Sequence, residues 1–173
     1  SAGAARFEGR MAVDLATGVV RWIDGCYGDT QAVTVMNGVV YGASHSHDCQ
    51  YMNFFPQQTP TNYQRITAET TTVGGAYQGG GTALVPNGAP IPSVVQFLPD
   101  LDGGGTASAW KNGPWALDNN GTYLVVGGEF LTVNQQPQQA LVRFAVPPTG
   151  RRTAGPIPLP APTAAVQPDG TVR

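Results

Sequence analysis

The densest group of polar side chains in the sequence runs from His45 to Asp48, just before the second of two cysteines. On an extended strand, side chains two residues apart point to the same face, so His45 and His47 would form a pair of imidazole ligands. Asp48, or Asp29 from a more distant turn, could supply a third ligand for a transition metal. The alternative is that these histidines only decorate a loop tied down by a disulfide.

A second candidate is the segment that begins Asp100-Leu101-Asp102 and continues with three glycines. Alternating carboxylates followed by glycine are typical of calcium-binding loops. The segment lacks the third oxygen ligand and the closing glutamate of such a loop. A glycine-rich turn that joins two strands explains Asp100 and Asp102 equally well, so calcium stays an open alternative and no cofactor is expected.

Aromatic residues gather after Cys49, next to several amide side chains. Exposed rings can stack on the CH groups of a sugar while amides bind its hydroxyls, so this loop predicts a ligand-binding site. The alternative is that Phe54 and Phe55 pack the loop onto a sheet, because phenylalanine is usually buried. The candidate ligand-binding residues are His45, His47, Tyr51, Phe55 and Tyr63.

No motif in the sequence predicts catalysis. The chain has no Gly-x-Ser-x-Gly element, and eleven acidic residues scattered over turns permit a carboxylate pair without indicating one. With nine Lys and Arg and no basic cluster beyond Arg151-Arg152, nucleic-acid binding is not expected. No run approaches the roughly 18 apolar residues of a membrane helix.

The two cysteines, Cys26 and Cys49, predict a disulfide. Charged residues make up only 12% of the chain, which is rich in Gly, Thr and Asn, and an even cysteine count in such a chain is typical of an oxidising compartment. We therefore expect a secreted or cell-surface protein, with two buried free thiols as the alternative. Closing this loop would stabilise the fold by roughly 3 kcal/mol in the chain-entropy model.

Short apolar runs bounded by turn residues predict an all-β fold. Asn37-Gly38 and Asn119-Asn120-Gly121 each separate two such runs and predict tight turns. The segment 70–92, rich in Thr, Gly and Pro, is expected to be an inter-blade excursion or a long loop. The expected strands are 10–14, 19–23, 31–36, 39–43, 63–67, 94–98, 115–118, 123–127 and 140–145.

The two tight turns lie in similar surroundings. Trp22 and Trp110 are 88 positions apart, and the turn glycines Gly38 and Gly121 are 83 apart, so the chain contains a degenerate repeat with insertions. Repeated short antiparallel meanders are how β-propellers are built. We expect propeller-like blades over 1–146, with repeats at about 10–68 and 94–146. A Pro-rich linker over 147–173 would lead toward a further module.

The string LVVGGEFLTVNQQPQQALVRF, residues 124–144, resembles the delta-sixty β-propeller repeat. The string GVVYGASHSHDC resembles it more loosely, with Ala43 and Ser44 at the glycine pair and His45 or His47 in place of the phenylalanine. The closing PDGTVR resembles the entry of a fibronectin type III domain. The positions that match the repeat are Gly127, Gly128, Phe130, Val133, Asn134, Leu141, Arg143 and Phe144.

This resemblance implies a propeller scaffold in a secreted actinobacterial protein and carries over no catalytic residue. A closed propeller has 4–8 blades, and this chain has room for three or four at most, so a complementary fragment or a homo-oligomer is an expected partner. The function we expect is a non-catalytic extracellular recognition or scaffold module that binds a glycan or a surface protein. The alternatives are part of a secreted hydrolase or lyase, and a structural blade array that forms a surface assembly.

Overall fold

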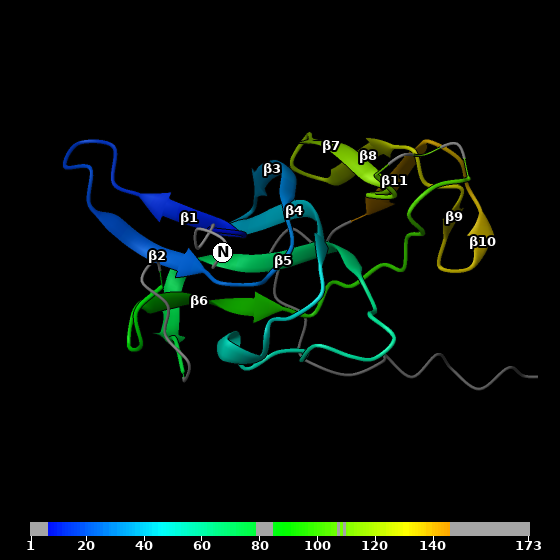
Figure 1. Ribbon diagram of the computed structural model, residues 1–173. Helices are drawn as coiled ribbons and strands as arrows, with labels where there is room; N and C mark the ends of the chain where they lie inside the picture. Colours follow the sequence, from blue (N-terminus) through cyan, green and yellow to red (C-terminus); the bar gives the residue numbers. More distant parts are fainter. Residues whose placement is uncertain (1–6, 79–84, 107, 109, 146–173) are drawn as a thin grey trace, which may run out of the picture.

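A four-stranded antiparallel meander forms the centre of the molecule. The computed structural model describes residues 7–78, 85–106, 108 and 110–145, and within them all extended strands pair antiparallel (Figure 1). The turn predicted at Asn37 and Gly38 is confirmed, since both residues have the positive φ that a tight hairpin requires, 52° and 76°. The central strands are β3 (Thr30–Met36), β4 (Val39–Ser46), β5 (Gln64–Ala76) and β6 (Pro90–Val95), in that order.

The prediction of a long loop over residues 70–92 is wrong for most of the described residues in that segment, which belong to strands. β5 continues to Ala76, and β6 begins at Pro90 and pairs back onto it. The pairing register slips twice between Glu69 and Gly75, so the two strands bend along their length. At Gly74 a Cβ would overlap Ser93 of β6, so glycine here permits close approach of two strands rather than breaking one. The run Gly79–Gly81 lies outside the described residues.

A three-stranded sheet packs on one face of the central sheet. Its strands are β7 (Pro114–Asn119), β8 (Tyr123–Gly128) and β11 (Leu141–Ala145), and the small hairpin of β9 (Thr132–Val133) and β10 (Gln136–Pro137) lies between β8 and β11 in sequence. β7 lies against β3 and β4, and the two sheets share one apolar core. That core includes Met36, Tyr41, Ile66, Leu101, Leu124, Val126 and Phe130.

A two-stranded sheet, β1 (Arg10–Val13) and β2 (Val20–Asp24), lies on the opposite face of the central sheet (Figure 1). The buried Trp22 of β2 donates a 2.9 Å hydrogen bond from Nε1 to the main-chain oxygen of Thr71 on β5. The three-stranded sheet, the central four-stranded sheet and the β1–β2 hairpin therefore form three packed layers. The described residues form no closed barrel and no closed propeller.

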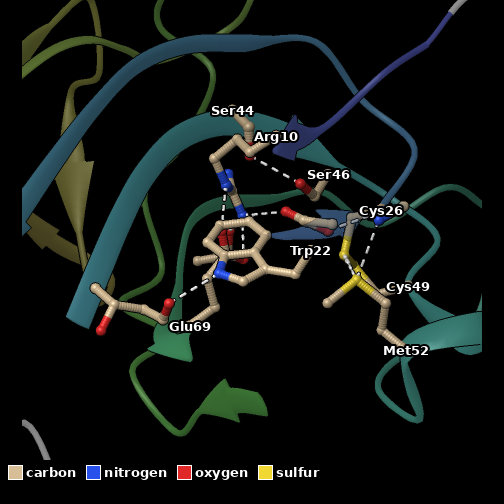
Figure 2. A network of polar contacts seen from close by, with 12 residues as sticks. Arg10, Trp22, Cys26, Ser44, Ser46, Cys49, Met52 and Glu69 are labelled. Atoms are coloured by element: carbon tan, nitrogen blue, oxygen red, sulfur yellow. Dashed lines mark hydrogen bonds and ion pairs between the residues drawn. A yellow bond between two sulfur atoms is a disulfide. The ribbon is translucent and has the colours of Figure 1, made fainter. Parts of the chain in front are cut away.

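Buried charges hold the outer two-stranded sheet to the centre (Figure 2). Arg10 of β1 donates from Nε to Glu69 Oε1 at 2.9 Å, and its Nη2 lies 2.5 Å from Asp24 Oδ2. Nη2 also donates to Thr67 Oγ1 at 2.8 Å. Burial, with the repulsion of Asp24, raises the pKa of Glu69 to about 7 against the attraction of Arg10. The guanidinium fits because Gly42, beneath it on β4, has no side chain.

The predicted disulfide between Cys26 and Cys49 is confirmed. Both cysteines are buried in a second apolar core, together with Met52 of the short 3₁₀ helix η1 (Gln50–Met52) and the buried Tyr77. The bond joins the loop after β2 to the loop after β4. It therefore fixes the two-stranded sheet to the central one at the end away from the hairpin turns.

The Pro-rich segment predicted as a linker, 147–173, lies outside the described residues. Among the described residues, no helix is long and apolar enough to cross a membrane.

Candidate functional site

A cleft of about 410 Å³ opens where the end of β4 and the start of β5 face the loop between β6 and β7. The central sheet contributes one wall, and the long loop that follows β6 contributes the other. The cleft is lined by Asp29, His45, Tyr63, Arg65, Trp110, Lys111 and Asn112.

Two aromatic rings of this lining are open to solvent. Trp110 is 76% exposed and Tyr63 is 39% exposed. The Tyr63 ring makes an edge contact with His45 at 5.9 Å between centroids, and the Arg65 guanidinium lies over it at 5.4 Å. A large exposed indole beside a cleft is unusual for a ring that only packs, because tryptophan is highly buried on average.

Arg65 holds the two walls together. Its Nη1 donates to the Leu101 carbonyl at 3.1 Å and its Nη2 donates to the Lys111 carbonyl at 3.3 Å. Burial lowers the pKa of the Arg65 guanidinium, while the carboxylates of Asp102 and Asp100 oppose that effect. Its Nε is buried without a hydrogen-bond partner in the described structure.

The carboxylate of Asp102 organises the loop that carries Trp110. It accepts hydrogen bonds from Gly104 N at 2.7 Å, from Leu131 N at 3.0 Å and from Thr132 Oγ1 at 2.5 Å. Burial raises the pKa of Asp102, but these hydrogen bonds outweigh it and leave the pKa below its ordinary value.

The loop joins the neighbouring sheet at its far end. Glu129 Oε1 accepts from Asn112 N at 3.1 Å, and Glu129 N donates to the Gly113 carbonyl at 2.7 Å. A hydrogen bond from Ser108 is the largest cause of the lowered pKa of Glu129, so its carboxylate stays ionised as an acceptor. Hydrogen bonds of Asp102 at one end and of Glu129 at the other therefore set the position of Lys111 and Asn112 in the cleft.

Both predicted histidines, His45 and His47, lie beside the ring of Tyr63, but the described side chains around them do not form a metal site. His47 lies 6.0 Å from Tyr63 between ring centroids, close to the distance of His45. His47 Nδ1 is hydrogen-bonded to Gln57 Oε1 at 2.5 Å. The Asp48 carboxylate accepts hydrogen bonds from the backbone and side-chain nitrogens of Gln50. In the described parts of the chain, no three His, Cys, Asp or Glu side chains come close enough together to hold a metal ion.

The calcium alternative also finds no support in the geometry. The Asp102 carboxylate is taken up by three donors of the protein itself. The Asp100 backbone pairs with Asn134, through Asp100 N to Asn134 Oδ1 at 2.9 Å and Asn134 N to the Asp100 carbonyl at 2.6 Å. The segment acts as an anchored glycine-rich turn.

The predicted aromatic site divides into two places. Tyr63 lines the cleft, whereas Tyr51 and Phe55 pack against the disulfide core, where Tyr51 contacts Tyr77 at 5.3 Å between centroids. Trp110 was not among the predicted ligand residues, although a tryptophan in a loop rich in Gly, Ser and Asn was a usable signal. Arg65, Lys111 and Asn112 were also missed, since nothing in the sequence brings β5 to that loop.

The side chains of the cleft lining can stack on a ligand and can donate and accept hydrogen bonds. Among the described residues that line the cleft, Asp29 is the only carboxylic acid, whereas glycoside hydrolysis canonically uses two. No family model, curated protein or solved structure matches this chain. Its function is therefore inferred from the chemistry of the cleft.

Proposed function

We propose that this protein is a non-catalytic recognition module that binds a glycan in the cleft between Tyr63 and Trp110. The observation that carries the proposal is an indole 76% exposed at the wall of a cleft of about 410 Å³ whose other side chains are mostly polar. That volume lies in the range of small-molecule sites.

The chemistry of the lining suits a sugar. The faces of Trp110 and Tyr63 can stack on the CH groups of a pyranose ring. His45 lines the same cleft, and its imidazole can hydrogen-bond to a sugar hydroxyl. Arg65 and Lys111 against one Asp29 give the lining more positive than negative charge, which favours a sugar that carries a carboxylate or sulfate.

The setting we propose is a propeller-like scaffold in an extracellular protein. Three packed antiparallel layers, of which the central one is a four-stranded meander, support blades of this kind. The disulfide between Cys26 and Cys49 supports an oxidising compartment. The likeness of residues 124–144 to the delta-sixty repeat belongs to the same proposal, as does completion of the scaffold by a further fragment or a second copy.

A panel of neutral and acidic polysaccharides, screened for saturable binding to the immobilised protein, tests the proposal. Binding of at least one acidic glycan is expected, weakened by about tenfold or more in Trp110→Ala and in Tyr63→Ala. Tyr123→Ala is the matched control, because Tyr123 also carries a guanidinium over its ring, that of Arg143 at 4.3 Å, but lies outside the cleft. Failure to bind any member, or equal binding by the Trp110→Ala protein, would refute the glycan proposal.

The same panel addresses the enzymatic alternative. Each polysaccharide that binds is incubated with the protein and assayed for new reducing ends. We expect none, because the described lining offers one carboxylate. Release of reducing ends that Asp29→Asn abolishes would instead establish a hydrolase.

A further inference from the structure

Lys111 holds its backbone in a conformation that lysine rarely adopts. Its φ is 54°, in the left-handed region where a side chain other than that of Asn or Asp costs free energy. Asn37, Asn134 and Gln135 share that conformation, but they lie in two-residue hairpin turns whose geometry requires a positive φ. Lys111 lies instead in the loop after β6, next to Trp110, in the wall of the cleft.

Hydrogen bonds from separate parts of the chain hold the loop in this conformation. Lys111 N donates to Ser108 Oγ at 2.8 Å, and the Lys111 carbonyl oxygen accepts from Arg65 Nη2 at 3.3 Å. The next amide, Asn112 N, donates to Glu129 Oε1 at 3.1 Å. These partners come from the loop itself, from β5 and from the residue after β8, so the surrounding structure imposes the strained geometry of Lys111. Strained backbone that is held in this way clusters at ligand-binding sites.

Lys111 is also the cation of the lining that a ligand meets in water. The guanidinium of Arg65 is engaged with the carbonyl oxygens of Leu101 and Lys111, whereas the Lys111 residue is exposed to solvent. Trp110, its neighbour in the chain, is 76% exposed and lines the same cleft. An ammonium group beside an exposed indole can form a charge-assisted hydrogen bond to an anionic substituent of a sugar that stacks on that indole.

We propose that Lys111 selects acidic over neutral glycans, by binding one carboxylate or sulfate group of the sugar that stacks on Trp110. The inference rests on the proposed function, because it names the substrate class of the same cleft. Lysine at this position lowers the stability of the fold relative to glycine, since the strain that glycine relieves exceeds the entropy that it adds to the unfolded chain. Affinity for an acidic ligand is the compensating gain.

Two pairs of polysaccharides that differ only in charge test the proposal: polygalacturonate with its methyl ester, and dextran sulfate with dextran. The unaltered protein should bind the acidic member of at least one pair about fivefold or more tightly than the neutral member. Lys111→Gly and Lys111→Asn should lose that preference, and Lys111→Arg, which keeps the charge, should retain it. The pair that shows the preference tells a carboxylate from a sulfate.

Urea unfolding separates a role in binding from a general loss of structure. Lys111→Gly should raise the urea midpoint while it removes the preference, which a misfolded variant would not do. Gln135→Gly is the control for strain, because Gln135 also has a positive φ, 63°, but lies in the β9–β10 turn outside the cleft lining. Arg21→Gln is the control for net charge, because Arg21 is an exposed cation of β2 that does not line the cleft. Neither control should change the preference.

Equal preference for the acidic glycan in Lys111→Gly and in the unaltered protein would overturn the proposal. A lower urea midpoint in Lys111→Gly, or no preference in either pair, would overturn it as well. If Trp110→Ala abolishes binding while Lys111→Gly leaves the preference intact, the assignment of Lys111 fails and glycan recognition in the cleft stands. If Trp110→Ala binds as tightly as the unaltered protein, the proposed function fails and the assignment of Lys111 fails with it.

Discussion

Nη2 of Arg65, on β5, donates a 3.3 Å hydrogen bond to the main-chain oxygen of Lys111, 46 residues further along the chain. This contact joins the central sheet to the loop that carries Trp110, and the second bond from the same guanidinium, to Leu101, strengthens it. The Arg65 side chain therefore joins the two walls of the cleft, in addition to the contacts of Asp102 and Glu129 with the same loop.

Replacement of Arg65 should weaken ligand binding through the position of the loop. Arg65→Gln leaves two carbonyls without their donor, so we expect the free energy of unfolding to fall by about 1–2 kcal/mol and the glycan Kd to rise about tenfold or more. Arg65→Lys keeps the charge but cannot bridge both carbonyls, so it should not restore binding. Faster amide exchange at Lys111 and Asn112 in both variants is the readout specific to a positioning role. Arg143→Lys is the control, and rescue by Arg65→Lys would contradict the account.

Two glycine variants test the buried ion pair. In Gly42→Ala the new methyl would meet the Arg10 guanidinium, whereas in Gly75→Ala it would make an ordinary contact with Ile91. Displacing one partner of a buried ion pair costs about 3–5 kcal/mol, so Gly42→Ala should destabilise the protein by about that amount. Gly75→Ala should change stability by about 1 kcal/mol at most. Urea unfolding measures both, and equal midpoints would contradict the packing of Arg10 on Gly42.

The Glu69 carboxyl should make the protein more stable at mildly acidic pH than at neutral pH. Its pKa is raised by burial and by Asp24 to about 7 in the folded state, from an ordinary value of 4.5. Between these values the folded state holds a proton that the unfolded state has lost, so the free energy of unfolding falls as pH rises. The contribution is fully present below about pH 4.5, is lost through pH 7, and amounts to about 3 kcal/mol.

Urea unfolding at pH 4.5, 5.5, 7 and 8 measures this dependence, with Glu69→Gln to remove it. The Gln variant should show a flatter profile over the same window. Glu129→Gln is the matched control. The pKa of Glu129 is lowered, so its contribution to the free energy of unfolding is lost only on acidification, and its replacement should not flatten the profile between pH 4.5 and 7. A stability that rises between pH 4.5 and 7 in the unaltered protein, with no change in Glu69→Gln, would contradict the buried cluster.

The disulfide should stabilise the protein mainly by lowering the conformational entropy of the unfolded chain. Cys26 and Cys49 are separated by 23 positions, and closing a loop of that length stabilises by about 3 kcal/mol in the chain-entropy model. The double variant Cys26→Ala/Cys49→Ala should lose about that amount, and a reducing agent should shift the urea midpoint of the unaltered protein but not of the variant. Identical midpoints with and without reductant in the unaltered protein would contradict the prediction.

Local signals in the sequence were sufficient for the hairpins and for the disulfide. Asn37-Gly38 can adopt the positive φ of a tight turn at little cost, and the flanking apolar runs need no other information to pair. Strand β5 was predicted only as far as Thr67, because Gly74 and Gly75 have low strand propensity in isolation. Their place in the sheet depends on Ser93, a contact between distant parts of the chain.

The candidate site was predicted only where it coincides with local pattern. His45 and Tyr63 were identified from the chemistry of their side chains, and both line the cleft. Phe55 has the same kind of side chain but packs on the second core, because the disulfide draws its loop there. Trp110 and Arg65 line the same cleft because the loop after β6 packs beside β5, and their spacing along the chain does not reveal this.

The indole resonances of the three tryptophans offer the most direct test of the cleft as the binding site. Trp110 lies in the cleft, Trp22 is buried elsewhere at 3% exposure, and Trp115 is outside the lining. In a titration with the glycan selected by the screen, followed by NMR, the Nε1–H signal assigned to Trp110 by its loss in Trp110→Phe should shift and saturate, while that of Trp22 should not move. Saturable binding that leaves the Trp110 signal in place would contradict the account.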